Sequence, residues 1–266
     1  MENGYIDTHC HLDMMLERFQ CGSFKELRDA YYPENFAGCV TISCDPGSIE
    51  RTLNLMDNQD VYGAFGIHPH EAKYYDDRLE DRIRAALAHP KALAWGETGL
   101  DYHYHHSPPG KQRSVFVQQI QQGVKLAKPL IIHSREAEED TLNIMRDNMP
   151  GEWEIHLHCF TGSADTALNF IQEFPRLFIG FTGAVTFKEG SEIQETVKAV
   201  PLERMLLETD APYMAPVPYR GKPSHSGHIP LIAEKIAALK NISIEEVYFQ
   251  TWKNAQQMYK NRVGPS

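Results

Sequence analysis

The stretch "YIDTHCHLD" (residues 5–13) places two histidines, one residue apart, directly after a short apolar run. If this run is a β-strand, successive side chains point to opposite faces, so His9 and His11 share a face. Two imidazoles on one face can bind one metal ion. The pair alone does not decide between a metal site and two ordinary polar residues, because His-x-His recurs at 68–70, 103–105 and 156–158.

Short runs of apolar and β-branched residues recur along the whole chain. Eight of them are predicted strands: residues 4–9, 39–44, 61–68, 92–97, 129–133, 154–158, 177–181 and 204–210. Helical periodicity lies between them, as at 76–89, 112–127 and 164–174, and a Ser-x-x-Glu capping box opens a last helix at 243–259. Strands this continuously apolar are typical of a parallel sheet covered on both faces. We therefore predict an α/β protein, a single TIM-type (β/α)8 barrel domain over residues 1–266.

Composition narrows the class of protein. The chain is 42% hydrophobic and 23% charged, as in globular proteins, and it lacks a membrane-length apolar run and a secretory signal. We expect a cytoplasmic protein without membrane contact, or a nuclear one in a eukaryote. The five cysteines are scattered and without a CxxC pair, which indicates reduced thiols. A net charge of -10 argues against a wide basic footprint on duplex nucleic acid, so any nucleic acid is held by few contacts.

Side chains that bind metals fall at the predicted C-terminal ends of five strands: His9, His11, Glu97, His133, His158 and Asp210. In a barrel these ends converge on one rim, where such enzymes place their active sites. Buried imidazoles and carboxylates need partners, and a metal satisfies several together. Six ligands exceed one tetrahedral zinc but suit two divalent ions about 3.5–4 Å apart, with Glu97 as the natural bridge.

The motifs, taken in order, resemble the TatD family of metal-dependent deoxyribonucleases, within the amidohydrolase-like barrels. They are "IDTHCHLD" (6–13), "GIHPH" (66–70), "GETGLDY" (96–102), "IIHSRE" (131–136), "HCFTGS" (158–163) and "LLETDAPYMAP" (206–216). The resemblance implies a TIM-type barrel, the six residues above as metal ligands, and hydrolysis of DNA phosphodiesters, often from the 3′ end, with Mg²⁺ or Mn²⁺. Zn²⁺ remains an alternative, because His/carboxylate sets accept it too.

Three residues receive catalytic roles. Asp210 can accept a proton from the attacking water, and Glu97 fixes the spacing of the ions. His68 resembles the family's substrate-facing histidine, a phosphate donor or leaving-group acid. The alternative for His68 is a histidine that caps the loop before Pro69.

Substrate contacts are expected on the loops of the same rim. "APVPYRGKP" (215–223) follows the last strand, where TIM barrels commonly bind phosphate. Arg220 can contact a phosphate with two N–H groups and Lys222 adds a point charge, unless the loop is simply solvated. We also assign Arg135 to substrate binding. The next stretch, "SHSGH" (224–228), departs from the Asn-x-Pro sequence of many relatives and leaves the packing of this loop open.

Two further features carry alternatives. Glu208 and Asp101 either orient metal ligands or pair with nearby cations. The loop "DYHYHHSPPGK" (101–111) either offers aromatic faces to an unpaired base or is an ordinary exposed loop.

The leading hypothesis is a two-metal deoxyribonuclease, acting as a 3′–5′ exonuclease on ends or single strands through a metal-activated water. The alternative is a binuclear amidohydrolase acting on a small cyclic amide or a related C–N bond. Many such enzymes bridge their metals with a modified lysine on strand 4, where this chain has Glu97. A non-enzymatic barrel that keeps a structural metal is the third hypothesis, although no ligand position is visibly lost.

Overall fold

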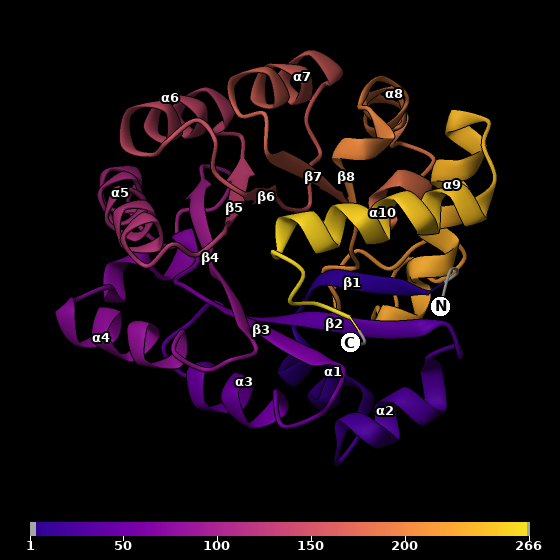
Figure 1. The fold of residues 1–266 in the computed structure, drawn as a ribbon, viewed down its shortest axis with the longest axis horizontal. Helices are drawn as coiled ribbons and strands as arrows, with labels where there is room; N and C mark the ends of the chain where they lie inside the picture. The colour runs from indigo at the N-terminus through magenta and orange to yellow at the C-terminus, as the bar shows by residue number, and fades with distance from the viewer. Residues whose placement is uncertain (1–3, 265–266) are drawn as a thin grey trace.

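The strands form one parallel sheet in chain order, from β1 to β8. A computed structural model describes residues 4–264 of the chain. The strands are β1 Tyr5–Cys10, β2 Phe36–Ser43, β3 Val61–Phe65, β4 Ala92–Asp101, β5 Leu130–Arg135, β6 Ile155–Leu157, β7 Leu177–Phe181 and β8 Met205–Leu207. Figure 1 shows the helices arranged around these strands. The architecture is the predicted (β/α)8 barrel of the TIM type.

Helices follow the strands on the outside of the sheet. They are α1 Leu12–Phe19, α2 Phe24–Tyr31, α3 Ile49–Leu55, α4 Asp77–Ala86, α5 Pro109–Lys125, α6 Glu138–Asn148, α7 Ala164–Glu173, α8 Ser191–Ala199, α9 Ile229–Lys240 and α10 Ile244–Met258. Short 3₁₀ turns are η1 Pro69–Tyr74, η2 Gly183–Thr186, η3 Leu202–Arg204 and η4 Ser226–His228. None of the helices in residues 4–264 combines the length and apolar character that a membrane span requires.

The barrel closes between its first strand and the segment after its last. The backbone N–H of Asp210 donates to the carbonyl oxygen of His9 (2.9 Å), and that of His11 donates to Ala211 (2.7 Å). Cys10 and Ala211 form a parallel β-bridge at the same place. Below it, Asp7 accepts hydrogen bonds from the backbone N–H (3.0 Å) and the hydroxyl (2.6 Å) of Thr209. These backbone hydrogen bonds therefore bring the two ends of the sheet together at the place where the candidate site lies.

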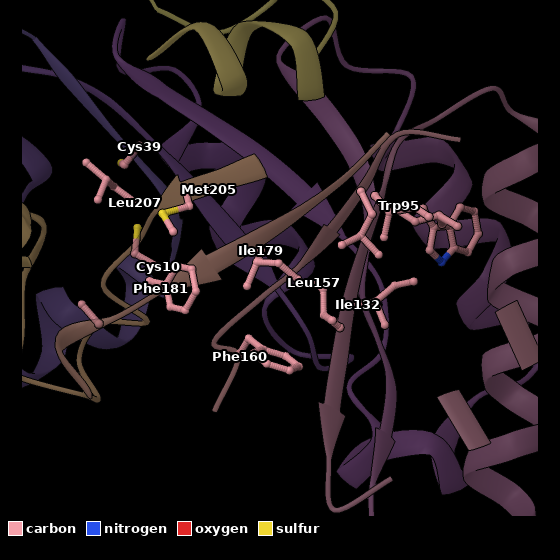
Figure 2. Close-up of a cluster of buried hydrophobic side chains, with 14 of the residues drawn as sticks. Cys10, Cys39, Trp95, Ile132, Leu157, Phe160, Ile179, Phe181, Met205 and Leu207 are labelled. Atoms are coloured by element: carbon pink, nitrogen blue, oxygen red, sulfur yellow. The ribbon is translucent and has the colours of Figure 1, made fainter. Parts of the chain in front are cut away.

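Apolar side chains on the outer face of the sheet form the larger of two cores. Ile132, Leu157 and Ile179 pair across β5, β6 and β7, and Figure 2 shows them in a row, with Phe160 below them in the view. Side chains alternate along a strand, so the neighbouring residues face the other side of the sheet. Ile131, for example, belongs to the smaller core. This alternation turns His133, two residues after Ile131, into the barrel.

The last helix supports the smaller core. Met258 and Tyr259, at the end of α10, pack with interior residues of the strands, and Figure 1 shows α10, in yellow, crossing in front of them. The predicted capping box is present, since the Ser243 hydroxyl accepts the N–H of Glu246 (3.1 Å). We propose that residues 1–266 form one domain, of which 1–3 and 265–266 lie outside the part described.

Strand boundaries differ from the prediction where the site lies. Strand β4 continues to Asp101, so Glu97 lies within the strand and not at its end. The pairing of β4 with β5 is irregular between Trp95 and Thr98, which places the Glu97 side chain in the barrel mouth. Asp210, by contrast, lies three residues beyond the end of β8. Buried polar residues at the mouth interrupt the apolar pattern, and the pattern alone therefore misplaces these ends.

Candidate metal centre

The six predicted ligands meet at the C-terminal mouth of the barrel. Three sets of ligand atoms lie within 4.8 Å of one another: His9, Glu97 and His158; His9, His11 and Asp210; and His68, Glu97 and His133. Both His9 and Glu97 belong to two of these sets. His9 links the first set to the second and Glu97 links the first to the third, so the three sets form one continuous cluster that could hold metal ions.

One half of the cluster comes from the barrel closure. Oδ1 of Asp210 lies 3.4 Å from Nε2 of His11 and 3.7 Å from Nε2 of His9. All three side chains sit on backbone that the bonds between β1 and the segment after β8 hold together. Residues about 200 positions apart in the chain therefore form one rigid group.

Glu97 forms the other half. Its Oε1 lies 2.6 Å from Nε2 of His158, 2.9 Å from Nδ1 of His133 and 3.5 Å from Nε2 of His68. Its Oε2 faces the other way and lies 3.5 Å from Nε2 of His9. The two oxygens of one buried carboxylate thus face different histidines, which is the geometry required of a bridging ligand.

The cluster contains polar atoms that the protein itself leaves unsatisfied. Both ring nitrogens of fully buried His9 and Nδ1 of His158 lack a hydrogen-bond partner among the described residues. Burial, with the neighbouring His158, lowers the pKa of His9 to about 3, so its imidazole is neutral. A neutral buried imidazole without a partner is a good metal ligand. The residues therefore fit divalent cations with nitrogen and oxygen ligands.

His68 occupies the mouth but differs from its neighbours in its hydrogen bonds. Its Nδ1 accepts the backbone N–H of His70 (3.0 Å), so in the neutral ring the proton is on Nε2. Burial lowers the pKa of His68 well below its usual value, against the opposing effect of Glu97. His68 therefore presents an N–H donor to the cavity. It also caps η1, which is the alternative given for it, and its role toward a substrate stays a prediction.

Asp101 and Glu208 contact histidines, and neither pairs with a lysine or arginine among the described residues. Oδ2 of Asp101 accepts a hydrogen bond from Nε2 of His133 (3.1 Å) and lies 3.0 Å from Nε2 of His70. This bond leaves Nδ1 of His133 facing Glu97. Glu208 lies 2.7 Å from Nε2 of His156, which is not a predicted ligand. Asp101 is thus placed to orient a ligand directly.

A cavity of about 1190 Å³ opens above the cluster. Arg135 lines it, whereas Arg220 and Lys222 are not among its lining residues and are exposed. The Arg220 guanidinium pairs with Glu189 (2.6 Å) and lies 4.3 Å from the centre of the Phe187 ring. A phosphate contact by Arg220 or Lys222 stays a prediction that requires the loop to turn toward the cavity.

The divergent loop packs inward. Ser224 donates its backbone N–H to Pro212 (2.9 Å), and its hydroxyl lies 3.2 Å from Nδ1 of His228. The ring of His225 lies 3.9 Å from that of His228 and is surrounded by aromatic side chains of α1 and α2. The "SHSGH" sequence therefore fastens the loop after β8 to the first two helices.

Some residues that line the cavity were not predicted as site residues from the sequence. Sγ of Cys44 lies 3.9 Å from Nδ1 of His11, and Tyr213 lines the cavity three residues after Asp210. Their positions after a strand were the available signal. In the 101–111 loop, Tyr102 bonds Asp140 (2.6 Å), while Tyr104 is exposed and lines the cavity. All five cysteines are free thiols, as predicted.

The chain matches a known protein family and a human relative in sequence. Residues 6–260 match the family described as TatD related DNase. The chain is 45% identical to the human protein named 3'-5' RNA nuclease TATDN2, over 81% of this chain and 29% of that protein. It therefore spans less than a third of the human protein's length.

Two bacterial proteins match over almost the full length. The metal-dependent hydrolase YabD of Bacillus subtilis is 34% identical, over 96% of this chain and 98% of YabD. The crystal structure of YJJV, a TatD homologue of Escherichia coli, superposes with a TM-score of 0.85 at 24% identity, covering 98% of this chain and 99% of YJJV. The chain therefore belongs to the TatD family of metal-dependent hydrolases.

Proposed function

We propose that this protein is a two-metal phosphodiesterase that removes nucleotides from the 3′ ends of DNA. The observation that carries the proposal is the carboxylate of Glu97, whose two oxygens face different histidines in a buried cluster. His9, His11 and Asp210 would hold one ion, His133 and His158 the other, with Glu97 between them. Bound divalent ions, Mg²⁺ or Mn²⁺ foremost and Zn²⁺ as an alternative, would neutralise phosphate charge and make water a better nucleophile.

The protein's own groups supply the proton transfers. Burial acts to raise the pKa of Asp210, but the hydrogen bond from His11 and the nearby imidazoles of His9 and His158 together outweigh it and lower the pKa, so the carboxylate is ionised. Asp210 can therefore accept a proton as water attacks phosphorus. The bond from phosphorus to the 3′ oxygen of the preceding nucleotide then breaks. The Nε2–H of His68 is placed to donate to an oxygen of the phosphate or to that leaving group.

The size of the cavity and the identity of the bridging residue on β4 favour a polymer over a small amide. A volume of about 1190 Å³ exceeds the roughly 300–1,000 Å³ of small-molecule sites. Strand β4 carries Glu97 where many binuclear amidohydrolases carry a modified lysine. Arg135 is the one lysine or arginine among the described lining residues, which suits a short contact at a chain end.

RNA is a second candidate substrate. The family is described by its deoxyribonucleases, but the 45% identical human relative is named as an RNA nuclease acting from 3′ to 5′. Both names describe cleavage of a phosphodiester bond, but one names DNA and the other RNA. The direction, 3′ to 5′, comes from the name of the human protein. The hydrolytic machinery proposed above serves either polymer.

The test is a digestion of two 5′-labelled oligonucleotides, one DNA and one RNA of the same sequence, with Mg²⁺ or Mn²⁺. Wild-type protein should shorten the labelled oligonucleotides stepwise from their 3′ ends. Glu97→Gln should lower the cleavage rate by roughly 10³-fold or more. Equal rates for wild type and Glu97→Gln would refute the site. Turnover of cyclic amides with both oligonucleotides untouched would replace the proposal by the amidohydrolase alternative.

A further inference from the structure

Three tyrosines stand exposed at the mouth of the cavity. Tyr74, Tyr104 and Tyr213 are 55%, 44% and 50% exposed, and all three line the cavity. They come from the segments that follow β3, β4 and β8. Exposed large apolar side chains are unusual when they gather at one place and indicate a contact surface. This group surrounds the candidate metal centre and has no role in the metal binding described above.

Tyr213 lies on the Asp210 side of the centre. Its ring stands edge-on to the ring of His11, with centroids 6.2 Å apart, and its hydroxyl lies 3.7 Å from the sulfur of Met14. These contacts hold one edge of the ring and leave the rest open. A flat apolar face is therefore presented next to a predicted metal ligand.

Tyr104 lies on the other side. The guanidinium of Arg135 is 5.1 Å from the centre of its ring, and His70 meets the ring edge-on at 5.5 Å. Arg135 forms no ion pair within the part of the chain that the structure describes, unlike Arg220, which is paired with Glu189. A cation over an aromatic ring, with no acidic partner, offers charge for a phosphate beside a face for a base.

The barrel order places these two rings apart. Tyr104 follows β4 and Tyr213 follows β8, four strands further round a sheet of eight. The metal cluster lies between them, because His133 of β5 bonds Asp101 beside Tyr104 while His11 contacts Tyr213. A chain whose phosphate sits at the cluster thus has one aromatic face on each side.

We propose that Tyr104, with Arg135, and Tyr213 are stacking platforms for the two unpaired bases that flank the scissile phosphate. The inference rests on the proposed nuclease function and names the side chains that would hold the unpaired bases of its substrate. In a duplex the two bases that flank a phosphate stack on each other, so they cannot lie against two separate rings without unstacking. The rings accept any base, since every base has a π-face.

The experiment compares Tyr104→Leu and Tyr213→Leu with wild type on a 5′-labelled single-stranded oligonucleotide. Each change should raise KM roughly 5- to 100-fold with a much smaller change in kcat. Tyr104→Phe and Tyr213→Phe keep the ring and should restore KM. Phe249→Leu is the matched control, because Phe249 is 53% exposed on α10, away from the cavity lining, and should behave as wild type.

A second substrate removes the bases and leaves the phosphates. An oligonucleotide with abasic residues at its two 3′-terminal positions should show a raised KM with wild type and no further loss with either leucine variant. Equal KM values for wild type and the leucine variants on the normal oligonucleotide would overturn the inference, even if cleavage is efficient.

Binding separates this inference from the proposed function. Fluorescence anisotropy of the labelled oligonucleotide in EDTA measures affinity without hydrolysis. Binding that weakens in the leucine variants, with no cleavage by wild type under any metal, supports the platforms and rejects the nuclease. Cleavage together with ring-independent binding supports the nuclease and rejects the platforms.

Discussion

The backbone N–H of Asp210 donates to the carbonyl oxygen of His9 over 2.9 Å, and this bond closes both the barrel and the candidate site. The same ladder holds His11 against Ala211 at 2.7 Å. Three predicted ligands therefore depend on pairing between the two ends of the sheet. The fold and the site are assembled by the same few hydrogen bonds.

Asp7 supports that closure from below, so Asp7→Ala should destabilise the protein. The change leaves the buried N–H and hydroxyl of Thr209 without their acceptor, at a cost of about 2–4 kcal/mol in the free energy of unfolding. Urea unfolding in EDTA measures this. Cys21→Ser, at a half-buried thiol away from the closure, should stay near wild type, and an unchanged midpoint for Asp7→Ala would contradict the role.

His68→Ala should separate catalysis from metal binding. Because Nδ1 of His68 accepts the N–H of His70, its Nε2 carries a proton and serves as a donor. We expect kcat to fall roughly 10²- to 10⁴-fold with Mn²⁺ affinity unchanged. His133→Ala is the comparison and should weaken Mn²⁺ binding by calorimetry. A His68→Ala protein that loses Mn²⁺ would show that His68 is a ligand.

Asp101→Asn should weaken metal binding, although Asp101 is not itself a predicted ligand. Oδ1 of Asp101 accepts the backbone N–H groups of His103 (3.0 Å) and Tyr104 (3.1 Å), so the new amide would turn its NH₂ toward Nε2–H of His133. Two donors then face each other and the imidazole loses its orientation. Mn²⁺ affinity should fall about 10- to 100-fold in a calorimetric titration. Glu136→Gln, an exposed carboxylate, is the control, and equal affinities for both variants would refute the effect.

His225 should make the metal-free protein sensitive to acid. Burial, with the neighbouring His228, lowers the pKa of His225 to about 3, against an ordinary value of 6.5. The unfolded chain therefore takes up the proton first as pH falls, and stability present above pH 6.5 is lost progressively toward pH 3. His225→Phe removes this titration and keeps an aromatic ring.

Thermal unfolding in EDTA at pH 7.5 and pH 5 checks that prediction. The decrease in Tm between the two values should be smaller for His225→Phe than for wild type. His105→Gln changes an exposed histidine and should show the wild-type decrease. A Tm decrease in His225→Phe as large as that of wild type would contradict the assignment.

The fold and the positions of the ligands follow from local pattern in the sequence. Eight apolar runs predict the strands, and His133 lies two residues after Ile131 on the same face because side chains alternate. The ligand set was predicted because polar residues interrupt apolar strands at one end. These signals need no knowledge of distant contacts.

What the sequence left open depends on contacts between distant segments. Arg220 is basic and follows β8, but Glu189, from another loop, pairs with it. Tyr102 and Tyr104 are alike in sequence, yet only Tyr102 meets Asp140. The extension of β4 beyond Glu97 follows from its pairing with β5 and not from its own apolar pattern.

Anomalous diffraction from a crystal grown with Mn²⁺ tests the central proposal most directly. We predict two Mn²⁺ peaks about 3.5–4 Å apart, one on each side of the Glu97 carboxylate. His9, His11 and Asp210 should contact one peak, and His133 and His158 the other. A single peak that Glu97 does not touch, or no peak at the barrel mouth, would contradict it.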